Sequence, residues 1–171
     1  NGLALLEGRD TFGEPPFQAV MLPEGGRALR QIAPLLPFFD IDPEKIQFLG
    51  TGLWDDPSLV KEPSLIGGWF AAPPPKFTQQ FVDKFSRTFG YKPPRIASLA
   101  YDAVALVSIL IRDYNSDFSD KSITSPSGFK GIDGIFRFQQ NGIVERGLAI
   151  IEVREDGLVV LDPPPTNFEV N

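Results

Sequence analysis

The sequence predicts an α/β fold: a parallel sheet with flanking helices, followed by a C-terminal β-hairpin. Residues 17–22 (FQAVML) and 46–49 (IQFL) are short apolar runs typical of strands, and segment 26–36 between them has its apolar residues on one helical face. A strand, a helix and a strand with short connections form the crossover unit of a parallel sheet. Alternating segments at 131–138 and 147–153 flank a Gln-Asn-Gly turn, in which Asn and Gly tolerate the positive φ of hairpins.

Further elements lie between these landmarks. Pro34 should end or kink the first helix near Gln31. Residues 65–71 (LIGGWFA) predict a third strand, and a phenylalanine at every fourth position of 77–89 predicts a helix with a core-facing aromatic stripe. The polar, Ser-rich segment 115–130 predicts a loop.

The longest apolar-periodic segment is 97–113 (ASLAYDAVALVSILIRD). It is apolar nearly all round, which predicts an interior helix packed on more than one side, because a surface helix would keep a polar face. Near its start, Tyr101 can present a hydroxyl to a cleft, whereas Asp102 suits a helix N-terminus, which favours negative charge.

Composition narrows the function classes. The chain has 171 residues, a net charge of −6, and neither His nor Cys. The acidic balance without a basic cluster argues against nucleic acid as a partner, and the missing thiols and imidazoles argue against the usual zinc or haem sites and against a catalytic triad. We therefore expect no enzyme, cofactor or metal. No apolar run approaches the roughly 20 residues of a membrane span.

The chain begins without an initiating methionine. Residues 1–7 resemble the tail of a helix that is already running, with no capping residue ahead of it. We therefore expect the chain to be the C-terminal part of a longer protein.

Residues 50–56 (GTGLWDD) directly follow the second predicted strand, at the edge where open parallel sheets place their ligand sites. They lack the ending of a phosphate loop and the further glycine of a dinucleotide fingerprint. Trp54 either walls a ligand cleft or packs in the core. Asp55 and Asp56 could pair as acid and base, but an Asp before Pro57 more often opens a turn.

The order of these motifs resembles one protein family. QAVMLPEGGRALRQIAPLL, IQFLGTGLW, LIGGWFAAPPP, FVDKFSRTFGYKPPRIASLAYDAVALVSIL and GIDGIFRFQQNGIVERGLAIIEV follow one another through nearly the whole chain. Together they resemble type I periplasmic solute-binding proteins of the branched-chain amino-acid receptor kind. The nearest likeness is to a proteobacterial lipoprotein branch described as penicillin-binding-protein activators.

The resemblance implies a two-lobed fold whose lobes, joined by crossing strands, close on a ligand. Residues 1–70 would form strand-helix-strand units of the second lobe, residues 71–130 would return to the first lobe as helices, and residues 131–171 would form a hairpin and tail near the crossing region. Surfaces meant for the remainder of the first lobe would then be exposed, so self-association of this chain is also expected.

The resemblance places second-lobe ligand contacts in the loops after the first two strands. Amino-acid receptors carry an acidic residue in the second of these loops, which binds the ligand's ammonium group, whereas this chain has Gly52 and Leu53 there. This departure favours another ligand or a partner-binding role. The ligand-binding residues that follow from the resemblance and the motifs are Glu24, Thr51, Gly52, Trp54 and Tyr101.

Two functions share this fold. The first is a non-enzymatic periplasmic receptor of a transport or sensing system, which captures a small solute, amino-acid-like or other, between its lobes. The alternative is an envelope lipoprotein, anchored through an N-terminus outside this chain, that binds and regulates a peptidoglycan synthase. The chemistry of the site has to distinguish them.

Overall fold

The computed structural model describes residues 15–168, so the helix tail expected at 1–7 lies outside the described residues. Two compact units are present. The first contains the described residues up to Ala72 together with Ile150–Leu161, and the second contains Pro73–Ala149 together with the described residues from Asp162 onward. The chain therefore passes between the units three times.

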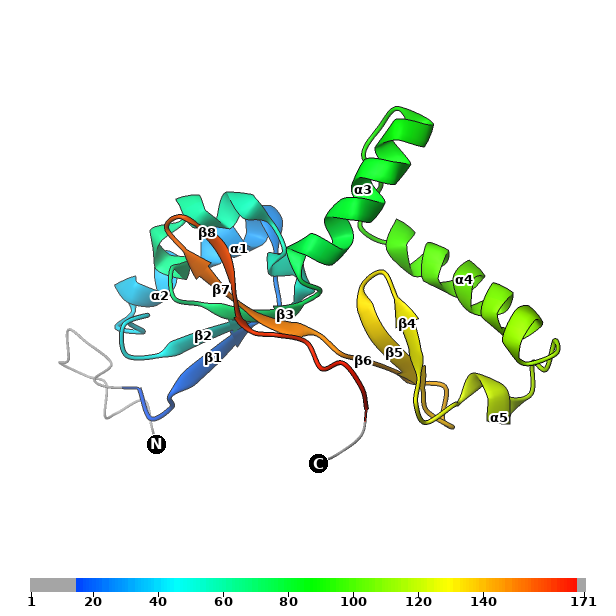
Figure 1. The fold of residues 1–171 in the computed structure, drawn as a ribbon. Coiled ribbons are helices and arrows are strands. Elements are labelled where there is room, and N and C mark those ends of the chain that lie inside the picture. Colours follow the sequence, from blue (N-terminus) through cyan, green and yellow to red (C-terminus); the bar gives the residue numbers. More distant parts are fainter. Residues whose placement is uncertain (1–14, 169–171) are drawn as a thin grey trace. The chain divides into compact units, whose positions relative to one another are not determined.

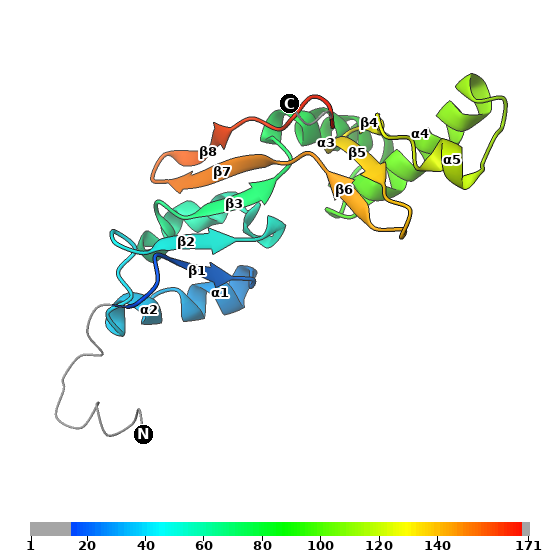
Figure 2. The same ribbon diagram turned by 90° about the horizontal axis from the view of Figure 1, so that it is seen from below.

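The first unit is built on a five-stranded sheet with the order β1-β2-β3-β7-β8 (Figure 2). The strands are β1 (Ala19–Leu22), β2 (Gln47–Gly50), β3 (Trp69–Ala72), β7 (Ala149–Arg154) and β8 (Gly157–Asp162). The pairs β1–β2 and β2–β3 are parallel, which confirms the predicted crossover arrangement. A short turn joins β7 to β8.

Short helices connect the parallel strands. They are α1 (Gly26–Ile32), α2 (Leu35–Phe38) and the 3-10 helices η2 (Gly52–Trp54), η3 (Pro57–Lys61) and η4 (Pro63–Leu65). Pro34 separates α1 from α2, which confirms the predicted break. The third strand begins later than expected, because η4 occupies its predicted start and Gly67 follows with a φ of 84°.

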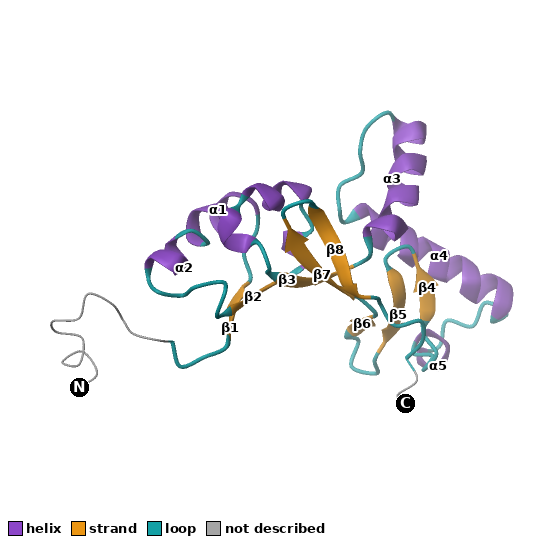
Figure 3. Cartoon of the chain, turned by 60° about the vertical axis from the view of Figure 1, so that its left-hand side comes forward, coloured by secondary structure: helices purple, strands orange, loops and turns teal. Residues whose placement is uncertain are grey.

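The core of the first unit lies on one face of its sheet. Burial alternates along the strands, so that Phe48, Phe70 and Ile151 are buried while their neighbours are partly or fully exposed. Leu29 of α1 is completely buried, and Figures 1 and 3 show α1 on one side of the sheet. The sheet thus has one packed face within the described chain.

The second unit combines three helices with a separate antiparallel sheet. Its elements are α3 (Pro75–Phe89), α4 (Ala97–Asp113), α5 (Asp120–Ile123), β4 (Phe129–Gly131), β5 (Gly134–Phe138) and β6 (Val144–Arg146). The sheet order is β4-β5-β6. Figure 3 shows α4 running beside this sheet, and the core between them consists of Leu106, Leu110, Phe129 and Phe136.

The C-terminal hairpin differs from its predicted form. The Gln-Asn-Gly turn is present, with Gly142 at a φ of 80°, but it joins β5 to β6. The predicted strand 131–138 is interrupted by a tight turn between β4 and β5. The second predicted strand, 147–153, corresponds to β7, and β6 lies before it as an additional short strand. The loop expected at 115–130 contains α5, which Ser119 caps by accepting a hydrogen bond from the Ser122 amide.

The helix α4 has the predicted bounds, and α3 begins two residues before the predicted stripe, but neither helix has the predicted burial. In α4 the buried positions are Ser98, Asp102, Leu106 and Leu110, a single stripe, so α4 packs on one side rather than on several. In the phenylalanine stripe of α3, only Phe81 is buried. The described chain supplies no element that covers the remaining apolar faces. None of its helices has both the length and the apolar character needed to cross a membrane.

Candidate functional site

The loops after β1 and β2 lie against each other. The two strands are parallel, with Leu22 opposite Gly50, so both loops leave the sheet at the same edge. The loops are residues 23–25 and 51–54. A Cβ atom on Gly25 would lie 2.8 Å from the Cβ of Leu53, so only a glycine allows this approach.

Trp54 holds the two loops together. Its side chain is completely buried, and its indole Nε1 donates hydrogen bonds to the carbonyl oxygens of Leu22, at 3.2 Å, and Glu24, at 3.1 Å. Glycines make room for the ring, since a Cβ atom would lie 2.2 Å from it at Gly50 and 2.7 Å from it at Gly68. Within the described chain the indole therefore packs, and its contribution to the site is to position the loops.

The solvent-facing groups of this edge come from the other predicted residues. Glu24 and Gly52 are exposed, and Thr51 is half-buried. The Thr51 hydroxyl accepts a hydrogen bond from the Leu53 amide at 3.3 Å and caps η2. Leu53 itself is 60% exposed, although sequence reasoning had noted it only as the substitute for an acidic residue. The two loops at this edge therefore carry an exposed carboxylate and an exposed apolar side chain.

Asp56 is a turn-forming residue. Its carboxylate accepts hydrogen bonds from the Ser58 hydroxyl at 2.7 Å, from the Ser58 amide at 2.9 Å and from Arg30 at 3.0 Å. The hydrogen bonds from Ser58, assisted by Arg30, hold the pKa of Asp56 below its ordinary value. A general acid needs a raised pKa, so the geometry confirms the turn and not an acid-base pair with Asp55.

Tyr101 belongs to the second unit, apart from the four other predicted residues. It is 44% exposed, its ring packs at 5.5 Å from Phe81, and the ammonium group of Lys84 lies 5.7 Å from the ring centre. These three side chains border a hollow that is distinct from the loops of the first unit.

Asp102 has a different role from the one expected, which was to place a negative charge at a helix N-terminus. It is 3% exposed and accepts a hydrogen bond from the amide of Ile132 at 2.7 Å, with Arg146 at 3.4 Å. A Cβ atom on Gly131 would lie 2.4 Å from the carboxylate. Asp102 therefore fastens α4 to the turn between β4 and β5. Between residues 15 and 168, no cluster of acidic side chains is suited to hold a metal ion.

Several solved structures are similar to this chain in fold. One is a putative branched-chain amino acid ABC transporter protein from Rhodospirillum rubrum, with a TM-score of 0.63, 20% identity, and coverage of 84% of this chain and 44% of that one. The chain has part of the type I periplasmic binding-protein fold.

Two more structures with this fold were solved with ligands. The substrate-binding protein LivJ from Streptococcus pneumoniae, in complex with isoleucine, has a TM-score of 0.51 and 16% identity, and the match covers 95% of this chain and 48% of that one. A solute-binding protein from R. palustris, in complex with benzoate, has a TM-score of 0.52 and 15% identity, and the match covers 86% and 44%. This chain thus spans less than half of each of these proteins with the type I periplasmic binding-protein fold.

Sequence comparisons add no assignment. No family model and no curated protein matches the chain. The likeness therefore lies in the type I periplasmic binding-protein fold.

Proposed function

We propose that this chain is part of a non-enzymatic periplasmic receptor that captures a small solute, and that the loops after β1 and β2 contribute to the binding site. The observation that carries the proposal is the joined pair of loops at the carboxyl ends of two parallel strands, held by the buried Trp54. Open parallel sheets bind ligands at this edge. The fold is also that of receptors whose structures hold isoleucine and benzoate.

The organisation of the receptor follows the same proposal. Residues 1–70 supply second-lobe elements, residues 71–130 return to the first lobe, and residues 131–171 lie near the crossing region. The three passages of the chain between its two compact units support this division. In a two-lobed receptor, hinge closure around the solute brings both lobes onto it, and Tyr101 is the residue we propose as a contact from the returning helices.

The groups at the edge of the sheet suggest the chemistry of the solute. The exposed Glu24 carboxylate suits an ammonium group, and the exposed side chain of Leu53 suits an apolar portion. Thr51 and Gly52 precede Leu53 in the second loop and offer a hydroxyl and an exposed backbone. The second loop lacks the acidic residue of amino-acid receptors, but Glu24 supplies a carboxylate from the first loop, so an amino-acid-like solute with an apolar side chain fits these groups best.

A thermal-shift screen of the protein at its full encoded length tests the proposal. Branched-chain amino acids and aromatic acids form the panel, because ligand binding to the native state raises the melting temperature. We expect a branched-chain amino acid to stabilise the protein and Glu24→Gln to remove the effect. Glu44→Gln, at an exposed position before β2, is the matched control and should preserve it.

The screen also separates solute binding from the alternative function. A protein that stays unresponsive to every compound, while remaining folded, would contradict the solute-binding proposal. The same fold would then serve as a scaffold for an envelope partner such as a peptidoglycan synthase.

A further inference from the structure

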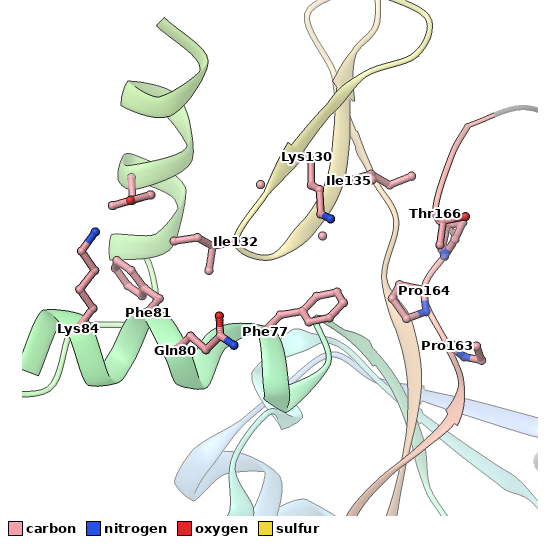
Figure 4. A pocket seen from close by; sticks show the side chains of 14 residues that line it. Phe77, Gln80, Phe81, Lys84, Lys130, Ile132, Ile135, Pro163, Pro164 and Thr166 are labelled. Atoms are coloured by element: carbon pink, nitrogen blue, oxygen red, sulfur yellow. The ribbon is translucent and has the colours of Figure 1, made fainter. Parts of the chain in front are cut away.

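The second unit contains a hollow of about 610 Å³. Its walls are α3, the start of α4, the turn between β4 and β5, and the segment 163–166 (Figure 4). All of these belong to one compact unit, so the hollow exists independently of how the two units sit. Its volume lies within the range of sites for small molecules.

Most of the wall is apolar. Phe77, Phe81 and Tyr101 contribute aromatic rings, and Ile132 and Ile135 contribute aliphatic side chains. Figure 4 shows Phe77 and Phe81 projecting from α3 on the side of the turn that carries Ile132. Phe77 is 46% exposed and Tyr101 is 44% exposed, so a bound apolar group would remove aromatic surface from water, which favours binding.

The charged side chains among the described residues that line the hollow are all positive. Lys84 and Lys130 are among the lining residues, and none of the described residues that line it is acidic. This is unusual in a chain with a net charge of −6. A lysine ammonium next to an apolar wall attracts a carboxylate more strongly than it would in open water, because the local dielectric constant is lower.

Buried polar contacts fix the wall formed by the turn between β4 and β5. Asp133 is 2% exposed and accepts hydrogen bonds from Ser98, at 2.7 Å, and from Arg95, at 2.9 Å. One residue earlier, the amide of Ile132 is bound by Asp102. The turn is therefore anchored to α4 on both sides of its tip. A wall that is already ordered costs less entropy when a ligand binds.

We propose that this hollow binds a small organic anion, a carboxylate attached to an aromatic or branched apolar body. The rings and the two isoleucines enclose the body, and Lys84 and Lys130 attract the carboxylate. The described residues that line the hollow all belong to the second unit, whereas the loops proposed above belong to the first. Tyr101 is shared by the two proposals, and the location of the shifts described below distinguishes them.

The test uses 3-phenylpropionate and its neutral analogue 3-phenylpropanamide as probes for the protein at its full encoded length. Titrations followed by amide chemical shifts report both affinity and location. We expect saturable binding of the carboxylate, with shifts centred on Ile132 and the segment 163–166, and about fivefold weaker binding of the amide, as two partly exposed ion pairs would give.

Substitutions test the attraction by the two lysines and the occupation of the hollow separately. Lys84→Gln and Lys130→Gln should each weaken binding of 3-phenylpropionate about two- to threefold, whereas Lys92→Gln, an exposed lysine outside the hollow, should leave it unchanged. Gln80→Trp places a ring inside the hollow from an exposed helix position and should abolish binding. Gln79→Trp, the neighbouring exposed position outside the lining, is its control.

Three results would overturn the proposal. The first is the absence of saturable shifts at millimolar probe, and the second is equal affinity for the acid and the amide. The third is a set of shifts confined to the loops of the first unit, which would instead place the probe at the site of the proposed receptor function.

Discussion

Replacement of Trp54 by phenylalanine tests whether the indole joins the two loops. Phenylalanine keeps an aromatic ring but removes the Nε1 donor, so the carbonyl oxygens of Leu22 and Glu24 lose their partner. A buried acceptor without a partner costs about 1–3 kcal/mol. The smaller ring also leaves a void at a completely buried position, so we expect a total loss of about 2–4 kcal/mol.

The assay is urea unfolding followed by the fluorescence of Trp69. The chain has two tryptophans, and both lie in the first unit, so the Phe variant retains one fluorophore that reports on that unit alone. Leu53→Ala is the control. Its side chain is 60% exposed, and its removal should cost less than about 0.5 kcal/mol. A loss below about 0.5 kcal/mol for the phenylalanine variant would refute the reasoning.

Three further predictions concern other positions. Gly50→Ala should destabilise the first unit by about 1–3 kcal/mol in the same urea assay, because its new methyl group would lie 2.2 Å from the indole. Gly52→Ala is the control and should be nearly neutral, because the nearest atom to its methyl group would be 3.7 Å away. Asp102→Asn should speed hydrogen exchange at the Ile132 amide, since the bond to a charged acceptor is replaced by a weaker one; unchanged protection would contradict the anchoring role. Asp56→Ala should lose about 1 kcal/mol at neutral pH through the missing cap. The folded-state pKa of Asp56 is lowered from 3.8. The difference in unfolding free energy between the variant and the unmodified protein should therefore be complete above pH 3.8 and should narrow as pH falls through the folded-state pKa. A difference that does not change with pH would contradict this role of Asp56.

The sequence predicts the local elements of this fold better than their burial. Pro34 and Gly90 are strong local signals for the end of a helix, and α1 and α3 end just before them. The burial of α4 depends on which elements cover it, and a single apolar pattern cannot identify them. Its exposed side chains, among them Val104 and Ile111, show that helical periodicity marks a face as apolar without showing what packs on it.

The candidate site was predictable as a location but not as a geometry. The position of residues 50–56 after a strand predicts the edge of the sheet at which the loops after β1 and β2 meet. The burial of Trp54 depends on Gly68, which lies fourteen positions later, just before β3, and leaves room for the ring. Such a tertiary contact has no local signal. The exposure of Leu53 likewise has no local signal, because an apolar residue between a glycine and a tryptophan could equally be buried.

The central claim is that the loops after β1 and β2 bind a solute. Chemical-shift mapping of the protein at its full encoded length, with the amino acid that stabilises it most in the thermal screen, tests the claim directly. The account predicts saturable shifts of the amides of Gly25, Gly52 and Leu53. Saturable binding that leaves all three amides unshifted would contradict it.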